Sequence, residues 1–410
     1  MILLFQLLYV SYYNSAGKLQ ELFKKKMLRV IYFCPSESMY GDNIALMRIM
    51  PYLVENGVKP YFVVSFEGKF TQYLKEHNYD YLVCHNRIWN LYNLDSPIRN
   101  FVIGGLWRLK HYVDNRMSVK RIASKLSTFN ADLVHSNSSN SSFGYYLAKE
   151  LSVKHIWHLR EYGKLDANKQ YFPCFKHFLY NKLDSVNNYT ISITPLIHDY
   201  FHRKTNSITI YDGVVDEEHV PDICLKKEKY FLYVGRLFEK KGVEMIIDAF
   251  IEKAAVDAGY KLLIAGAGET EYETYLKNKV SHSKLDERIL FLGYRQDVFD
   301  LMAKAKALIV ASDFEGFGFI TAEAMYAGCY VIGKNTAGTK LQFDNLNKKL
   351  GYEIGSRFMG KDTLSCIMES IMAEKLDVKK SLSVVQTAVG ELYGIRKSAS
   401  KVFEFYNKIR

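Results

Sequence analysis

The sequence lacks the features by which cysteines form disulfide frameworks or zinc sites. Its six cysteines are scattered singly along 410 residues, and no C-x-x-C motif brings two of them together. This usage is typical of reduced thiols in a cytosolic protein. The sequence also contains no internal repeat and no low-complexity segment, so a repeat or low-complexity protein is not expected.

Long apolar runs are also missing. Residues 1–10, MILLFQLLYV, are apolar, but a span of the bilayer needs about 20 such residues. Because Met27 directly precedes a strand-like run, we expect residues 1–26 to be an N-terminal extension. The alternative is an interfacial anchor that places Lys24–Lys26 at lipid phosphates. We expect a cytoplasmic protein, with peripheral contact at the inner face of the plasma membrane as the second location considered.

The net positive charge of the chain comes from its first half. Residues 1–205 contain 26 Lys and Arg against 15 Asp and Glu, and the rest of the chain contains 29 of each. Such asymmetry indicates that the first half meets an anionic partner, such as nucleic acid, membrane phosphates or a phosphorylated substrate. Chance clustering in a lysine-rich sequence is the other interpretation.

Short apolar runs alternate with longer amphipathic ones, a pattern that favours βα units and parallel sheets. The pattern occurs twice, with a break near SITIYDGVVDEE. We therefore predict an α/β chain with two Rossmann-like domains facing each other across a cleft, and C-terminal helices that pack back on the first domain. The predicted ranges are 27–205 for the first domain, 206–390 for the second domain and 391–410 for the returning helix.

Three predicted strands of the second half end in residues suited to bind phosphate. Arg236 and Lys241 flank the tight turn GRLFEKKG, and a guanidinium fork with an ammonium group forms a good clamp for a diphosphate. Gly266 in GAGE lets the backbone approach a ligand. Gly318 in DFEGFGF precedes a predicted helix, whose free N–H groups and positive dipole end favour an anion.

Two glutamates accompany this cationic turn. Glu315 precedes the predicted helix, and Glu323 lies about one turn inside it. A carboxylate accepts hydrogen bonds from two sugar hydroxyls, so the pair suits a ribose and a second sugar while Arg236 and Lys241 neutralise phosphates. The sequence has no D-x-D motif, so we expect no metal and no cofactor, only a UDP- or GDP-linked sugar as the donor substrate.

The order YVGRLFEKKG, LLIAGAGE, ILFLGYRQDV and DFEGFGFITAEAMYAG resembles the C-terminal half of retaining GT-B glycosyltransferases of family 4, also called group 1. The resemblance is strong over residues 208–338 and looser elsewhere. It implies that Arg236 and Lys241 hold the donor diphosphate and that Glu323 binds the nucleotide ribose. The transferred sugar would contact Glu315 and the GT4 loop that follows it, namely Gly316, Phe317 and Gly318.

The first half resembles the same family less closely. PSESMYGDN retains only Gly41 of the paired glycines in the first loop of the family. Among the histidines at predicted strand ends, His158 is the candidate beside the reacting sugar. His135, Arg160 and Glu161 are the candidates for binding the acceptor. The other interpretation of a histidine at such a position is a structural residue whose hydrogen bonds are satisfied within the protein.

The predicted reaction transfers a sugar from a nucleotide diphosphate to an acceptor hydroxyl with retention, catalysed by His158, Glu315, Arg236 and Lys241. The resemblance implies a hexosyltransferase in bacterial surface polysaccharide assembly (capsule, O-antigen or exopolysaccharide). Its acceptor would be a saccharide or a lipid-diphosphate-linked saccharide, with no nucleic acid as partner. A sugar-nucleotide epimerase on the same scaffold is the alternative. A NAD-dependent dehydrogenase is disfavoured because GAGE does not complete G-x-G-x-x-G.

Overall fold

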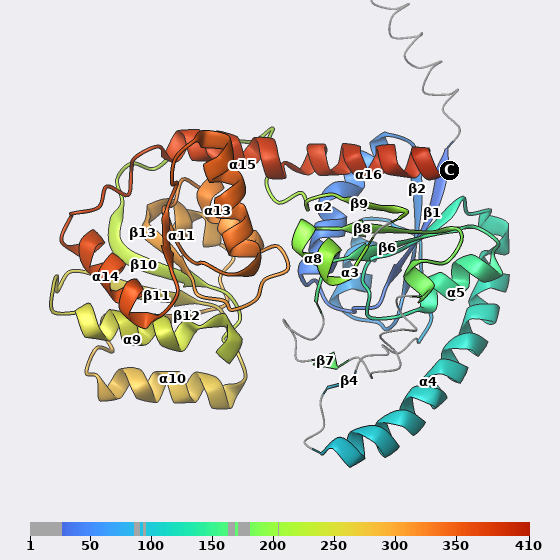
Figure 1. Cartoon of the computed structure of the whole chain (residues 1–410), viewed down its shortest axis with the longest axis horizontal. Coiled ribbons are helices and arrows are strands. Elements are labelled where there is room, and N and C mark those ends of the chain that lie inside the picture. The colour runs from blue at the N-terminus through green and yellow to red at the C-terminus, as the bar shows by residue number, and fades with distance from the viewer. Residues whose placement is uncertain (1–26, 86–90, 93–95, 163–168, 171–180, 204) are drawn as a thin grey trace, which may run out of the picture. The chain divides into compact units, whose positions relative to one another are not determined.

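The computed structural model describes residues 27–85, 91–92, 96–162, 169–170, 181–203 and 205–410 (Figure 1). The predicted extension 1–26 lies outside these ranges. The chain divides into two compact units, and each is described by itself. The first unit takes in residues up to His158, Pro173–Thr190 and Ala399–Arg410, and the second takes in Leu159–Phe172 and Ile191–Ser398.

A seven-stranded sheet with the order β3-β2-β1-β5-β6-β8-β9 forms the first Rossmann-like layer. Strand β1 is buried at six of seven positions and pairs in parallel with both β2 and β5. The strand-like run predicted after Met27 is confirmed as β1. The elements are β1 (Leu28–Cys34), α2 (Gly41–Glu55), β2 (Val58–Val64), α3 (Lys69–Glu76), β3 (Tyr81–Val83), β4 (Leu91–Tyr92), α4 (Pro97–Leu126), β5 (Leu133–Ser136), α5 (Phe143–Glu150), β6 (Lys154–Leu159), β7 (Lys169–Gln170), β8 (Asn188–Ser192), α8 (Pro195–Tyr200) and β9 (Ser207–Thr209).

The second sheet has six strands in the order β12-β11-β10-β13-β14-β15. It starts at its centre, because β10 pairs in parallel with β11 on one side and β13 on the other. The elements are β10 (Glu228–Val234), α9 (Val243–Lys253), β11 (Lys261–Ala265), α10 (Thr270–His282), β12 (Ile289–Gly293), α11 (Val298–Lys304), β13 (Ala305–Val310), α12 (Phe319–Tyr326), β14 (Val331–Lys334), α13 (Ala337–Leu350), β15 (Ser356–Phe358), α14 (Lys361–Met372), α15 (Leu382–Tyr393) and α16 (Ile395–Ile409).

One face of the second sheet is covered by α9 and α14. Phe231 of β10 and Ile264 of β11 share a buried core with Ile246 of α9 and Met368 of α14. These apolar contacts hold the six strands together, since burial of such side chains contributes about 1.5–3 kcal/mol each. The two Rossmann-like units predicted from the alternating pattern are thereby confirmed.

Helix α9 ends earlier than the sequence pattern predicts. The run VEMIIDAFIEKAAVDAG predicts a helix that is stopped by Gly259, whereas α9 stops at Lys253. The guanidinium of Arg288 donates to the carbonyls of Ala254, Asp257 and Tyr260 at 2.7–2.9 Å. These three carbonyls therefore have hydrogen-bond partners without being part of a helix. Arg288, about 30 positions further along the chain, thus permits the irregular turn before β11.

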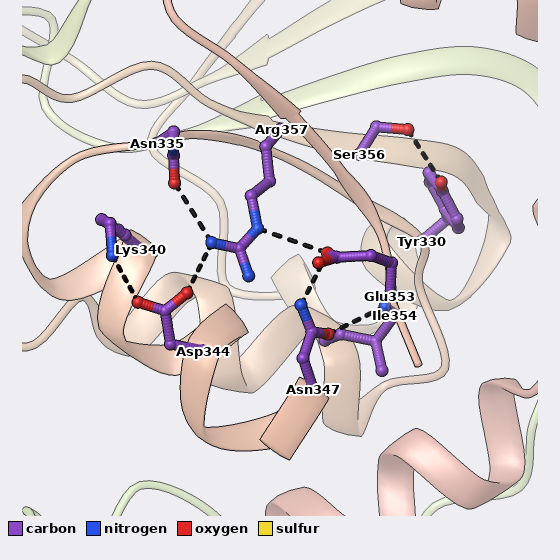
Figure 2. A network of polar contacts seen from close by, with 9 residues as sticks. All are labelled: Tyr330, Asn335, Lys340, Asp344, Asn347, Glu353, Ile354, Ser356 and Arg357. Carbon is purple, nitrogen blue, oxygen red and sulfur yellow. Dashed lines mark hydrogen bonds and ion pairs between the residues drawn. The ribbon is translucent and has the colours of Figure 1, made fainter. Parts of the chain in front are cut away.

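A polar network holds the end of α13 against β15 (Figure 2). Arg357 of β15 donates to Asp344 of α13 at 2.6 Å and to Asn335 at 3.2 Å. Burial tends to raise the pKa of Asp344, but hydrogen bonds from Lys340 and Arg357 outweigh that effect and lower it. The network fixes α13, and the start of this helix supports the site described below.

The C-terminal part of α16 belongs to the first unit. Its end is held by Lys154 of β6, which donates to the carbonyl of Ile409, and by Arg410, which donates to the carbonyl of Met27 at 3.1 Å. Tyr406 of the same helix is fully buried. The predicted return of a C-terminal helix to the first unit is thus observed, while the predicted domain boundaries at 205/206 and 390/391 remain predictions.

Candidate functional site

The loops that carry the predicted site residues follow three neighbouring strands. Arg236 and Lys241 follow β10, Gly266 follows β11 and Glu315 follows β13, and these strands are adjacent in the order β11-β10-β13. The strand order reverses between β10 and β13. In open parallel sheets, ligands bind beyond the carboxyl ends of the strands at such a reversal. The topology therefore places the candidate site at one edge of the second sheet.

Lys241 and Glu315 form an ion pair at this edge. The Nζ atom of Lys241 lies 2.7 Å from Oε1 of Glu315, with side chains 29% and 19% exposed. Partial exposure leaves both groups reachable by a ligand. Arg236 is exposed, and its guanidinium carbon lies 5.1 Å from the ring centre of Phe238.

The pKa of the Tyr233 hydroxyl depends on the charges around it. This tyrosine is the second-to-last residue of β10, and its hydroxyl donates to the carbonyl of Arg236 at 2.8 Å. Burial raises the pKa of Tyr233, the carboxylate of Glu315 raises it further, and the charge of Arg236 acts in the opposite direction. Arg236 and Glu315 therefore both act on one buried hydroxyl, so the predicted cation and carboxylate share one neighbourhood.

Two glycine loops pack directly against each other at the same edge. Gly266 has a φ of +146°, and a Cβ built on it would lie 1.8 Å from the carbonyl oxygen of Gly235. Leu237 donates its N–H to the carbonyl of Ala267 at 2.9 Å, so the loops continue the parallel pairing of β10 and β11. Only glycine fits at position 266, because any side chain would collide with the neighbouring backbone.

The loop from Glu315 to Gly318 is held by the start of α13. Gly338 donates its N–H to the carbonyl of Glu315 at 3.0 Å, and Nε2 of Gln342 donates to the carbonyls of Phe317 and Gly318 at 2.7 and 2.8 Å. Gly318 adopts a φ of +88° and directly precedes α12. The helix therefore begins where predicted. Its first N–H groups follow Glu315, the acidic member of the Lys241–Glu315 pair, after a few residues of the chain.

Glu323 lies in the second turn of α12 and is half-buried. It is followed by a helix end at Tyr326, where Ala327 donates its N–H to the Glu323 carbonyl at 2.9 Å. The position inside a short helix agrees with the geometry expected for a ribose-binding carboxylate. That role stays a prediction.

Arg160 is engaged in a buried ion pair with Asp212. Its own backbone lies close to the Glu315 loop, since a Cβ built on Gly316 would lie 2.6 Å from the carbonyl oxygen of Arg160. The side chains of both ion-pair partners are about 95% buried. This geometry favours a structural task for the guanidinium, while its predicted contact with the acceptor, like that of Glu161, stays a prediction.

In the first unit, the two candidate histidines contact each other. Nε2 of His135 lies 3.1 Å from Nδ1 of His158, and both residues are buried. Nδ1 of His135 lies 2.6 Å from the hydroxyl of Tyr406. His135 therefore lies between a helix hydroxyl and His158. No sequence pattern pointed to Tyr406, which is 271 positions away.

A third histidine, His155, has a different environment. Its Nδ1–H donates to Oδ1 of Asn188 at 2.6 Å, and its Nε2 accepts from the hydroxyl of Ser136 at 2.8 Å. Burial lowers its pKa to about 3, although the bond to Asn188 acts in the opposite direction. The ring is therefore neutral at physiological pH and serves as a structural group of the sheet.

The first sheet reverses its strand order between β1 and β5, and asparagines bridge this point. Asn137, directly after β5, donates to the carbonyl of Asp42 at 2.9 Å, and Asn43 donates to the carbonyls of Ser36 and Ser38. Gly41 is the exposed first residue of α2 in this region. The polar run SNSSNSS after β5 is the sequence signal that would have pointed to Asn137.

No helix within the described ranges has the length and apolar character needed to cross a membrane.

The chain is similar to known proteins both in sequence and in fold. Residues 216–355 match the family model described as Glycosyl transferases group 1. N-acetylgalactosamine-N,N'-diacetylbacillosaminyl-diphospho-undecaprenol 4-alpha-N-acetylgalactosaminyltransferase of Campylobacter jejuni is 28% identical over 38% of this chain and 42% of its own length. N-acetyl-alpha-D-glucosaminyl L-malate synthase of Bacillus anthracis is 31% identical over 28% of this chain and 29% of its own length.

The fold extends over more of the chain than these sequence matches. The crystal structure of Anabaena Alr3699/HepE in complex with UDP has a TM-score of 0.75 at 15% identity, covering 93% of this chain and 100% of that one. The two curated relatives are matched over less than half of their lengths. The resemblance found in the sequence is thereby confirmed for the second unit, and the named proteins give no support to an epimerase.

Proposed function

We propose that this chain, a GT-B protein of the glycosyl transferases group 1 family, transfers a sugar from a nucleotide diphosphate to an acceptor hydroxyl with retention. One observation carries the proposal. The 2.7 Å pair between Lys241 and Glu315 joins the turn after β10 to the loop before α12, at the reversal of strand order. A cation and a carboxylate side by side suit a ligand that presents a phosphate next to a sugar.

The roles of the second unit follow from charge. As the bond between sugar and phosphate breaks, negative charge grows on the departing diphosphate. Arg236, Lys241 and the N–H groups at the start of α12 stabilise that charge, which is the electrostatic contribution usually largest in such reactions. Lys241 exchanges part of its contact with Glu315 for the phosphate, and the freed carboxylate accepts hydrogen bonds from the transferred sugar.

The acceptor and the second catalytic group belong to the first unit in this proposal. His158 contacts the reacting sugar, and the departing phosphate accepts the proton of the acceptor hydroxyl on the same face of the sugar. The acceptor is a saccharide or a lipid-diphosphate-linked saccharide in surface polysaccharide assembly. The Campylobacter relative, whose name includes a diphospho-undecaprenol, supports this class. The basic first half supports an anionic acceptor or an anionic membrane surface.

The donor is a UDP- or GDP-linked hexose, bound without a metal because Arg236 and Lys241 supply two cations from the turn after β10. The neighbouring structure of HepE contains UDP, which supports a uridine donor. The test is incubation of the protein with UDP- and GDP-hexoses and a panel of lipid-linked and free saccharides, with EDTA present. We expect a product whose anomeric configuration, read by proton NMR, equals that of the donor. Inversion, or epimerisation of the donor without any acceptor, would contradict the proposal.

A further inference from the structure

A chain of hydrogen bonds connects the C-terminal helix to His158 inside the first unit. The hydroxyl of Tyr32 on β1 lies 3.3 Å from that of Tyr406 on α16, Tyr406 lies 2.6 Å from Nδ1 of His135, and Nε2 of His135 lies 3.1 Å from Nδ1 of His158. All four side chains are buried. The chain therefore runs from one strand through a helix to the ends of two other strands.

The chemistry of imidazole makes this chain directional. A neutral histidine ring has one N–H donor and one acceptor nitrogen. His135 contacts a partner at each nitrogen, so it must donate at one end and accept at the other. Its tautomer therefore fixes which nitrogen of His158 carries the hydrogen, and the direction of the bond to the Tyr406 hydroxyl sets the tautomer of His135.

Two arrangements satisfy these contacts. If Tyr406 donates to Tyr32, its oxygen accepts from Nδ1–H of His135, and Nε2 of His135 accepts from Nδ1–H of His158. In the opposite arrangement, Tyr406 donates to His135 and every bond reverses. The geometry favours the first arrangement, because the hydroxyl of Tyr406 donates to the oxygen of Tyr32 at 3.3 Å. This arrangement leaves Nε2 of His158 as an acceptor for a sugar hydroxyl.

We propose that Tyr406 and His135 are positioning residues that hold His158 in its Nδ1–H tautomer. This inference rests on the proposed function only for the task of His158, since the hydrogen-bond chain is a property of the protein itself. It assigns a purpose to the return of α16 to the first unit. The carbonyl of Ile409 accepts from Lys154 on β6, the strand that carries His158, so helix and histidine are fixed to each other.

Ring nitrogen NMR of ¹⁵N-histidine-labelled full-length protein tests the coupling directly. In the wild type we expect one tautomer of His158, with Nδ1 protonated. Tyr406→Phe removes the hydroxyl but keeps the ring, so we expect His158 to become a mixture of both tautomers. The matched control is Tyr189→Phe, because Tyr189 packs on the same helix, with its ring centre 6.2 Å from that of Phe405, and is not a member of this hydrogen-bond chain. Unchanged ring shifts of His158 in folded Tyr406→Phe would overturn the proposal.

Kinetics test the consequence. We expect Tyr406→Phe to lower kcat about ten- to a hundred-fold, as for other groups that orient a functional histidine, with nucleotide affinity unchanged. His135→Gln, which keeps one donor and one acceptor, should retain more activity than His135→Leu. A kcat equal to that of the wild type in Tyr406→Phe would overturn the positioning role even if the tautomer changes. A wild-type protein without transferase activity would refute the proposed function instead, and the NMR result would still decide the coupling.

Discussion

The two units expose their candidate groups very differently. In the second unit, Lys241 and Glu315 are partly exposed and held on loops, with glycines allowing close approach of the backbone. In the first unit, His135 and His158 are buried on strands and contact other side chains. Ligand contact in the second unit needs only an exchange of partners, whereas the first unit presents groups that are positioned by their surroundings.

This difference predicts how amino-acid substitutions will act in each unit. A substitution in the second unit should act on ligand binding and turnover with the fold intact. A substitution in the first unit should act through packing, tautomer or pKa. The predictions that follow test this contrast, beginning with the largest expected effect.

Lys241→Ala should lower kcat/KM by about 10²–10³-fold, equivalent to about 3–4 kcal/mol, because it removes a cation aimed at developing phosphate charge. The fold should survive, since the ion pair with Glu315 is partly exposed and contributes little to stability. Steady-state kinetics with a sugar nucleotide, beside a urea unfolding curve, measures both. Lys240→Ala in the same turn is the control, and full activity of Lys241→Ala would refute the site assignment.

Gly266→Ala should lower the free energy of unfolding by about 3 kcal/mol, since the added Cβ meets the Gly235 carbonyl oxygen in an unfavourable backbone conformation. Gly293→Ala is a matched control, because Gly293 also has a positive φ, +63°, but has no atom within 4 Å of the added Cβ. We expect the control to lose only about 1 kcal/mol. Equal losses in urea unfolding would show that the close contact of the two loops contributes nothing.

Glu323→Gln should weaken binding of nucleoside diphosphates about ten- to a hundred-fold, because hydrogen bonds to a charged group contribute about 1.5–3 kcal/mol. Isothermal titration with UDP and GDP measures the loss, and their 2′-deoxy forms sharpen it. The variant should discriminate less between ribose and deoxyribose than the wild type does. If the discrimination is unchanged, Glu323 does not bind the ribose.

His155 should make the first unit sensitive to acid. Its pKa falls from the ordinary 6.5 to about 3 on folding, so the unfolded chain binds the extra proton between these values. Stability is therefore complete above pH 6.5 and declines as the pH falls, by about 2 kcal/mol at about pH 5. Urea unfolding at about pH 7 and about pH 5 should show a smaller decline in His155→Gln. The same decline in both proteins would contradict this environment.

The sequence predicted the second unit well because its information is local. Each site residue there stands directly after a buried strand, and neighbouring parallel strands bring their ends together. Lys241 and Glu315 lie 74 positions apart, yet their contact follows from the order of β10 and β13. The early stop of α9 did not follow, because it depends on the distant Arg288.

The first unit was less predictable because its contacts depend on segments far apart. The histidines at the ends of β5 and β6 were found, but their partner Tyr406 belongs to a helix at the other end of the chain. In the second unit, the pairing of Arg160 with Asp212 likewise joins a strand end to a segment 52 positions away. Strand patterns place such residues at an edge of a sheet without indicating which side chain from elsewhere covers them.

The central claim is that Arg236 and Lys241 bind the diphosphate of the donor. Isothermal titration of UDP against UMP, and of GDP against GMP, tests it most directly in the wild type and in Arg236→Ala and Lys241→Ala. The account predicts that for at least one base the diphosphate binds about tenfold or more tightly than the monophosphate, and that each substitution removes most of this difference. Equal affinity for mono- and diphosphate in the wild type, or a preference that survives in both variants, would contradict it.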